Sequence, residues 1–252
     1  VCYSYSSGER DLNRLSRFSL RDRAIGGELV LIDAMPDAIY HNGCRVVIGP
    51  DGLLYASMGE ALAPDKAQDP AYLGGKTFRI NRDGSIPEGN PFGNSPVWTI
   101  GHRNPQGLAF HPVTGALWST EHGPEKRDEL NIIRKGMNYG WPTCEGTQPV
   151  CGSITNYAPA IRQYEDSSTI AISDLVFYTG NAFPAWRNQI FFVSLKTGRL
   201  YRVALDGERV AEQEILIDNT YGRLRDITVG PDGFIYFSTD AEDGRILRLR
   251  PR

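Results

Sequence analysis

The chain has 252 residues, a formal net charge of −3, and 27 Gly and 16 Pro. The slight acidity argues against nucleic acid or an anionic membrane as a partner, and no run of 18 apolar residues offers a membrane-spanning helix. Turn-forming residues are abundant and long Ala/Leu/Glu/Lys stretches are missing, which favours strands and turns over helices.

The chain begins with two segments that are typical of strands, VCYSYSSG (1–8) and LSRFSLRD (15–22). The first residues have neither the basic start nor the apolar core of a signal peptide. We interpret the two segments as the last strands of a sheet whose opening strands are missing from this sequence.

One plan then recurs along the chain: a strand, a Pro-containing turn, and an aromatic-bearing strand that ends in a polar group. It is carried by GPDGLLYASMGE (49–60), HPVTGALWSTEHG (111–123), GPDGFIYFSTDAEDG (230–244) and a longer variant, FPAWRNQIFFVSLKTG (183–198). A further strand signal follows each, over 76–84, 129–136, 245–251 and 200–207 respectively. A four-stranded antiparallel unit repeated around an axis is the simplest structure with this pattern.

The sequence therefore predicts an all-β fold, a β-propeller that forms a single domain over 1–252 and is incomplete at its N-terminus. Four repeats and the partial one make a little under five blades, whereas a propeller closes its ring to protect its edge strands. The innermost strands are expected to start near Val46, Leu108, Asp174 and Ile227. A β-sandwich is the alternative, but it does not explain why the same turn recurs with the same partner strand.

The segment GHRNPQGLAFHPVTGALWSTEHGP (101–124) carries more polar groups than strand pairing requires. Residues 108–110 and 116–120 alternate as half-buried strands do, with a turn at 111–115 between them. An antiparallel pair would bring its two polar ends, 102–104 and 122–124, to one rim. We expect the functional site at that rim.

The four cysteines give two expectations. Cys144 and Cys151 flank a turn-rich loop and are predicted to form a disulfide in an oxidising compartment, the alternative being two free thiols. Neither CxxC spacing nor a paired histidine accompanies them, which argues against zinc. Cys2 and Cys44 stay open, either as buried strand residues or as a second pair.

In their order along the chain, these motifs resemble the soluble quinoprotein sugar dehydrogenases, the glucose/sorbosone dehydrogenase family, and most of all its aldose sugar dehydrogenase branch. GHRNPQG (101–107), EHGP (121–124) and NYGWP (138–142) are the specific motifs, whereas GPDG alone is weak. The resemblance runs from residue 1 to residue 252. It implies a six-bladed propeller, of which this chain would lack the first blade, and an enzyme that binds pyrroloquinoline quinone (PQQ) and calcium.

The resemblance also implies residues for PQQ, a planar ortho-quinone with three carboxylates. Arg223, Arg225 and Lys196 would hold the cofactor, since guanidinium groups bind carboxylates bidentately. In an extended segment, the spacing of the two arginines places them on one face. Arg103 and Asn104 match the pair that contacts the quinone oxygens, and Arg103 is also counted as catalytic.

Calcium takes hard oxygen ligands, including backbone carbonyls. By the same resemblance, the carbonyls of Gly123 and Pro124 would bind the calcium that polarises the reactive quinone carbonyl. Glu129 and Tyr139 match the ligands of a second, structural calcium, and Asp128 lies beside them. The alternative is a surface carboxylate pair near a buried aromatic residue.

Among the four histidines, His41 occupies the family's catalytic position. There it would accept the proton of the anomeric hydroxyl while the C1 hydride passes to PQQ C5, giving the lactone. His111 falls in a hairpin turn and is expected to be exposed. Cys44 departs from the family, which has a smaller residue there, so its side chain narrows the pocket beside His41 or pairs with Cys2.

A periplasmic or secreted protein is implied, with a small-molecule aldose as substrate, an external electron acceptor, and a monomeric or homodimeric state. One competing function is a calcium-dependent sugar lactonase of the propeller type, which has no use for Arg223, Arg225 and Lys196. The other is a non-catalytic binding propeller, which would not need His41. We expect one pocket at the top face of the propeller, lined by the carbonyls of Gly123 and Pro124 and by the side chains of His41, Arg103, Asn104, Lys196, Arg223 and Arg225.

Overall fold

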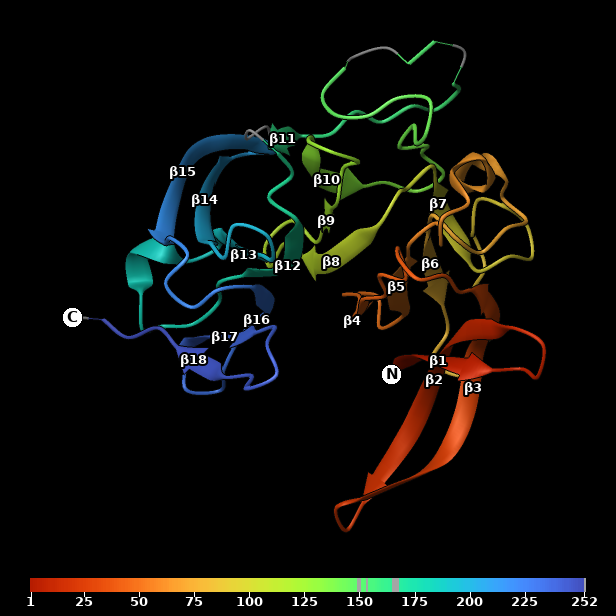
Figure 1. Ribbon diagram of the computed structural model, residues 1–252, viewed down its shortest axis with the longest axis horizontal. Helices are drawn as coiled ribbons and strands as arrows, with labels where there is room; N and C mark the ends of the chain where they lie inside the picture. Colours follow the sequence, from red (N-terminus) through yellow and green to blue (C-terminus); the bar gives the residue numbers. More distant parts are fainter. Residues whose placement is uncertain (149–150, 153, 165–167, 252) are drawn as a thin grey trace. The chain divides into compact units, whose positions relative to one another are not determined.

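The computed structural model describes residues 1–148, 151–152, 154–164 and 168–251 (Figure 1). Within these ranges the chain forms five antiparallel sheets, and in each sheet strands that follow one another in sequence lie side by side. Two short 3-10 helices, Pro64–Gln68 (η1) and Pro184–Trp186 (η2), lie in the connections. The up-and-down strand order is that of propeller blades and confirms the predicted all-β class.

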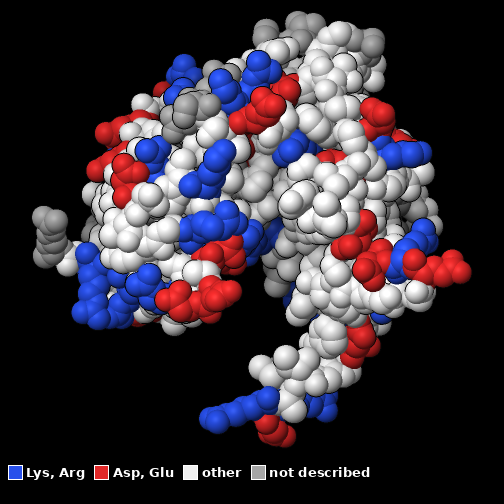
Figure 2. Space-filling model, in the orientation of Figure 1, with Lys and Arg blue, Asp and Glu red and all other residues white. Residues whose placement is uncertain are grey.

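The chain divides into two compact units, which are described in turn. The first consists of Val1–Pro105, Arg134–Cys144 and Pro149–Ala158, and the second of Gln106–Ile133, Glu145–Gln148 and Pro159–Arg252. Among the described residues, no helix combines the length and the apolar character that crossing a membrane requires. On the face shown in Figure 2, acidic and basic side chains are interspersed.

The first unit holds a three-stranded and a four-stranded sheet. The strands are β1 (Cys2–Ser6), β2 (Asp11–Arg21) and β3 (Ala24–Pro36) in one, and β4 (Val46–Ile48), β5 (Leu54–Met58), β6 (Lys76–Ile80) and β7 (Val97–Ile100) in the other. The sequence indicated the first two strands but missed β3. The first seven residues of β3 are exposed and contain two glycines, so they show no apolar alternation. With β2 it forms a long hairpin (Figure 1).

The core of the first unit lies between its two sheets. Leu15 and Met35 from the first sheet are buried together with Met58 and Phe78 from the second. Two disulfides brace this unit. Cys144–Cys151 confirms the prediction, and Cys2–Cys44 decides the open alternative in favour of a bond that ties β1 to the segment before β4.

The second unit holds three sheets, and the division between the units falls after Pro105, the first residue of β8. The strands are β8 (Pro105–Phe110), β9 (Leu117–Glu121), β10 (Asp128–Ile133) and β11 (Arg162–Tyr164); β12 (Ile172–Phe177), β13 (Ile190–Ser194), β14 (Leu200–Asp206) and β15 (Arg209–Ile217); and β16 (Leu224–Val229), β17 (Ile235–Thr239) and β18 (Ile246–Arg248). The last sheet has three strands among the described residues, where a complete unit of four was predicted.

The first strands of neighbouring sheets approach each other in the second unit. The Ser173 hydroxyl on β12 donates to the carbonyl of Leu224 on β16, at 3.0 Å. A Cβ atom at Gly107 on β8 would lie only 2.7 Å from a Leu175 methyl group, so glycine allows β8 to approach β12. Strand β9 is buried along its whole length, which corrects the expectation of a half-buried strand.

The four predicted strand starts, Val46, Leu108, Asp174 and Ile227, all fall in the first strand of a sheet. This explains why the repeated turn could be recognised in the sequence: in each of these four sheets it joins the first strand to the second. Their place nearest a propeller axis, the sixth blade, the missing N-terminal blade and the single domain stay predictions.

Candidate functional site

The predicted site residues lie at corresponding ends of the sheets. His41 precedes β4, Arg103 and Asn104 precede β8, and Arg223 precedes β16. The connections that follow the second strand of a sheet carry Gly123 and Lys196. Since the first and second strands of each sheet are antiparallel, the start of one lies beside the end of the other.

In the first unit, the Nδ1 atom of His41 is hydrogen-bonded to the Glu60 carboxylate. The Glu60 residue is only 1% exposed, and its second carboxylate oxygen has no hydrogen-bond partner among the described residues. The His41 side chain is half-buried. The contact orients the imidazole ring through Nδ1 and does not involve Nε2.

Backbone contacts fix this pair. His41 adopts a positive φ of 64°, and its carbonyl accepts a hydrogen bond from the Ala61 amide at 3.2 Å. The Glu60 amide donates to the carbonyl of Arg103 at 2.8 Å. A Cβ atom at Gly59 would overlap the His41 carbonyl, so only glycine fits between the two segments.

Asn104 joins the same cluster. It is 3% exposed, and its Oδ1 atom accepts a hydrogen bond from the amide of Gly43 at 3.0 Å. The Arg103 guanidinium lies over the Trp141 ring, with Cζ 5.4 Å from the ring centroid. Hydrogen bonds thus link the segments that carry His41, Arg103 and Asn104 within the first unit, and their roles stay predictions.

Two other residues of the predicted motifs, His102 and Tyr139, contact each other in the first unit. The His102 imidazole is buried, contacts Thr99 Oγ1 at 2.8 Å and stacks on the Tyr139 ring at 4.5 Å. The Tyr139 hydroxyl accepts a hydrogen bond from the Arg134 amide at 2.9 Å. The side chains of this pair therefore brace the connection between β7 and the 138–142 motif.

In the second unit, Asp128 anchors the turn at Gly123 and Pro124. Its carboxylate accepts hydrogen bonds from the Gly123 amide at 2.9 Å, the Thr169 hydroxyl at 2.7 Å and the Ala171 amide at 2.9 Å. Burial raises the pKa of Asp128, and these hydrogen bonds partly offset the rise. The turn predicted to offer carbonyl oxygens to calcium is therefore tied through Asp128 to the segment 169–171.

Arg223 and Arg225 converge on one carboxylate, that of Asp240. Nitrogen-to-oxygen distances to Asp240 Oδ2 are 2.8 Å from Arg223 Nη2 and 3.0 Å from Arg225 Nη2. Burial works to raise the pKa of Asp240, but the hydrogen bonds from the two arginines outweigh it and lower the pKa. Arg225 also donates to Gln106 Oε1 at 3.2 Å.

Lys196 is exposed on a turn that is hydrogen-bonded to two segments, the one that Asp128 holds and the loop before Arg223. Its amide donates to the Ile170 carbonyl at 3.1 Å, next to the segment that Asp128 holds. The Asn219 amide donates to the Gly198 carbonyl, also at 3.1 Å, and so ties the turn to the loop before Arg223. The predicted calcium turn, lysine and arginines are thus connected within the second unit.

Glu129 lies opposite Glu121 in the register of β9 and β10, and both residues are buried. The Glu129 carboxylate accepts hydrogen bonds from Asn131 Nδ2 at 3.0 Å and from the Gly146 amide. Burial raises the pKa of Glu129, and the neighbouring Glu121 raises it further. Two facing buried carboxylates favour a cation or a shared proton.

The sequence missed two members of the site and misplaced one residue. Glu60 and Asp240 each close a repeat of the aromatic-bearing strand, and this shared position was the signal that could have found them. His111 is not exposed as expected: its ring lies edge-on against Phe177 at 4.8 Å, and its Nδ1 accepts the Val113 amide. The single pocket predicted for His41, Arg103, Asn104, Gly123, Pro124, Lys196, Arg223 and Arg225 stays a prediction, since these residues divide between the two units.

Comparison with known proteins supports the resemblance seen in the motifs. The sequence profile of the Glucose / Sorbosone dehydrogenase family matches residues 1–248. An aldose sugar dehydrogenase from Escherichia coli strain K12 is 34% identical over 226 residues, which cover 84% of this chain and 60% of that relative. The chain therefore spans about three fifths of that protein's length.

Two solved structures are similar over nearly the whole chain. The soluble aldose sugar dehydrogenase from Escherichia coli in its apo form has a TM-score of 0.90 at 31% identity, covering 100% of this chain and 77% of the other. The PQQ-bound form of aldose sugar dehydrogenase from Streptomyces coelicolor has a TM-score of 0.82 at 31% identity, with coverages of 97% and 73%.

Proposed function

Because the chain belongs to the glucose/sorbosone dehydrogenase family, we propose that it oxidises aldose sugars at C1 to the lactone, with PQQ and calcium as cofactors. The observation that carries the proposal is the contact between His41 and the buried Glu60. A half-buried imidazole held by a buried carboxylate is an arrangement suited to general-base catalysis.

His41 is the proposed general base. Its Nε2 accepts the proton of the anomeric hydroxyl, because Nδ1 is engaged with Glu60. The Glu60 carboxylate stabilises the imidazolium that this transfer creates and keeps the ring in one orientation. Asn104 and the glycine at position 59 hold the two segments in place.

The second unit offers groups that fit PQQ. Arg223 and Arg225 already share the carboxylate of Asp240, so their guanidinium groups can reach one carboxylate together. With Lys196 they are the residues proposed to hold the PQQ carboxylates, and Arg103 and Asn104 are proposed for the quinone oxygens. When bound, PQQ supplies the quinone carbonyl at which the C1 hydride is accepted.

Calcium fits oxygen donors in the same unit. Gly123 and Pro124 are proposed to bind it through their carbonyls, and the contact of Asp128 with the Gly123 amide holds their turn in place. As the resemblance implies, Glu129 of this unit and Tyr139, which belongs to the first unit, are proposed for a second, structural calcium. The burial of Glu129 beside Glu121 supports this assignment, because a cation would offset their mutual repulsion.

The two disulfides support a periplasmic or secreted location, because such bonds persist in oxidising compartments. We also propose an external electron acceptor, which returns PQQ to its oxidised state after each turnover.

The decisive experiment is dye reduction with glucose after PQQ and calcium have been added. His41→Ala should lower kcat by ~10²–10⁴-fold with PQQ affinity nearly unchanged, the usual range for loss of a general base. Arg225→Ala should mainly weaken PQQ binding, whereas Arg209→Ala, at an exposed arginine paired with Asp206, should change neither.

Three outcomes would overturn all or part of the proposal. If both His41→Ala and Arg225→Ala lost only PQQ affinity, His41 would not be the base. No dye reduction with any of several aldoses, together with accelerated hydrolysis of gluconolactone, would favour a lactonase instead. No activity in either assay would favour a binding protein.

A further inference from the structure

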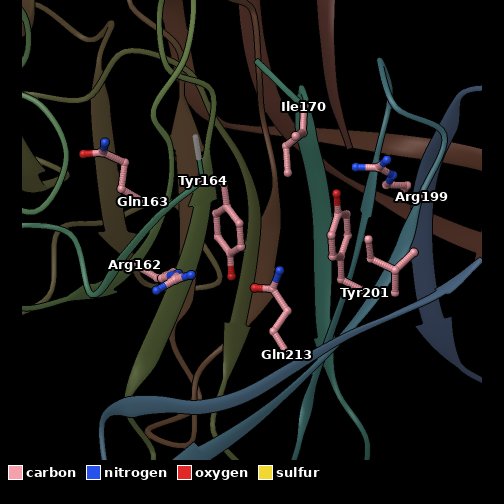
Figure 3. A pocket seen from close by; sticks show the side chains of 8 residues that line it. Arg162, Gln163, Tyr164, Ile170, Arg199, Tyr201 and Gln213 are labelled. Atoms are coloured by element: carbon pink, nitrogen blue, oxygen red, sulfur yellow. The ribbon is translucent and has the colours of Figure 1, made fainter. Parts of the chain in front are cut away.

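A cavity of about 230 Å³ lies in the second unit and is lined by none of the residues proposed for catalysis, PQQ or calcium. Side chains from three strands border it: Tyr164 on β11, Tyr201 on β14 and Gln213 on β15 (Figure 3). Ile170 contributes an apolar part of the wall. The volume is below the roughly 300–1,000 Å³ of pockets for drug-sized ligands, so a monosaccharide-sized molecule suits it.

Among the described residues that line the cavity, every charged side chain is cationic. Arg162 and Arg199 contribute two guanidinium groups, and none of the described residues that line the cavity carries a carboxylate. Arg199 is paired through Nε with Asp218 at 2.7 Å, outside the lining, and this contact orients the side chain. A guanidinium group held in this way is suited to a carboxylate ligand.

Tyr164 supplies a second, independent indication of a ligand. The residue is 6% exposed, and its hydroxyl has no hydrogen-bond partner among the described residues. Its ring is fixed against Phe192 and Tyr201, with centroid distances of 5.2 Å and 6.4 Å. Burial raises the pKa of Tyr164, so the hydroxyl stays protonated and can donate. Buried polar groups normally have partners, and a bound molecule would provide one.

The lining also matches a hydroxylated ligand. Tyr164 and Gln213 extend toward the same part of the cavity (Figure 3), where a hydroxyl donor and an amide are available to sugar hydroxyl groups. The two tyrosine rings offer flat apolar surface for the C–H face of a sugar. Guanidinium, amide and aromatic groups together select a ligand with one carboxylate and several hydroxyls.

We infer that this cavity binds a sugar acid, such as an aldonate or a uronate. The inference goes beyond the proposed function and does not depend on it, because none of the lining residues takes part in the proposed oxidation. It is tested by binding to the full chain without PQQ, so failure of the dehydrogenase assay leaves the test intact.

The probe is D-gluconate, measured by isothermal titration calorimetry and by saturation-transfer NMR. D-glucose tests the need for the carboxylate, and acetate tests the need for the hydroxyls. Gluconate should bind at least ~10-fold more tightly than either. Arg199→Gln should weaken gluconate binding at least ~10-fold and Tyr164→Phe about 3-fold or more, since each removes one contact and leaves the β-sheet framework in place.

Arg202→Gln is the matched control, because Arg202 lies on β14, the strand that directly follows Arg199, but pairs with Glu212 and Glu214 outside the cavity lining. It should leave gluconate affinity unchanged. Circular dichroism and thermal melting confirm that each variant is folded. Equal binding of acetate and gluconate, no gluconate binding at all, or equal affinity in Arg199→Gln, Tyr164→Phe and the wild type would each overturn the inference.

Discussion

The buried carboxylate of Glu60 contacts the Nδ1 atom of His41, which lies 19 residues earlier in the chain. The turn between β4 and β5 brings Glu60, which follows β5, back to the segment before β4, because the two strands are antiparallel neighbours. The position of His41 therefore depends on the same repeated hairpin that builds the sheet. The hairpin that builds the sheet thus also positions the proposed catalytic base.

Glu60→Gln is expected to lower kcat while PQQ affinity stays within about 2-fold of the wild type. The amide keeps the size of the side chain but cannot stabilise an imidazolium, so the fall should be smaller than the ~10²–10⁴-fold expected for loss of the base itself. Steady-state kinetics and PQQ titration measure the two effects. Glu88→Gln, at an exposed position of the same unit, is the control, and an unchanged kcat for Glu60→Gln would contradict the assigned role.

The disulfides are expected to differ in their contribution to stability. Cys2–Cys44 closes a loop with a sequence separation of 42, and Cys144–Cys151 one of 7. In the chain-entropy account, the first contributes about 4 kcal/mol and the second about 2 kcal/mol. Denaturant unfolding of the two paired Cys→Ser variants should show the larger loss for the Cys2/Cys44 variant. The opposite order would show that strain or residual structure in the unfolded chain dominates.

The repeated hairpins could be predicted from the sequence, whereas individual contacts between distant residues could not. The turns before Leu54, Leu117 and Ile235 share Gly, Pro and an apolar alternation, so the hairpins could be predicted. The pairing of Cys2 with Cys44 could not, because it depends on how two sheets face each other. Strand β3 was missed because pairing with β2 holds it, and its exposed half carries no apolar pattern.

The candidate site shows the same division. His41, Arg103 and Asn104 were predicted from motifs, and their proximity in the first unit agrees with those motifs. Glu60 and Asp240 were overlooked because a carboxylate at the end of a strand is common on protein surfaces. Only the folded structure shows that Glu60 contacts an imidazole and that Asp240 contacts two guanidinium groups.

Lys76 gives a pH-dependent prediction. Its ammonium group is buried and donates to the carbonyls of Ala67 at 2.8 Å and Gly74 at 2.7 Å, which fixes the loop after Glu60. Burial lowers the pKa of Lys76 to about 7. Above that pH the folded chain has lost a proton that the unfolded chain keeps up to its ordinary pKa of 10.5, so stability rises with pH in this window.

The free energy of unfolding of the wild type, relative to Lys76→Met, should therefore increase by about 2 kcal/mol between pH 7 and pH 9. Urea unfolding at several pH values measures it. Lys66→Met removes an exposed lysine of η1 and should show the wild-type pH dependence. Parallel pH profiles for the wild type and Lys76→Met would show that Lys76 keeps its ordinary pKa.

Glu129 provides the test of the second calcium. Calcium that binds only the folded chain stabilises it by about 2.7 kcal/mol at a hundredfold excess over Kd, so the wild-type Tm should rise when calcium is added. Glu129→Gln removes one of two facing buried carboxylates. Without calcium, this variant should melt at or above the wild-type temperature, because the repulsion from Glu121 is relieved. With calcium, its rise in Tm should be clearly smaller than that of the wild type.

Glu242→Gln, at an exposed glutamate of the same unit, should respond to calcium as the wild type does. An equal calcium-induced rise in Glu129→Gln and the wild type would rule out Glu129 as a calcium ligand.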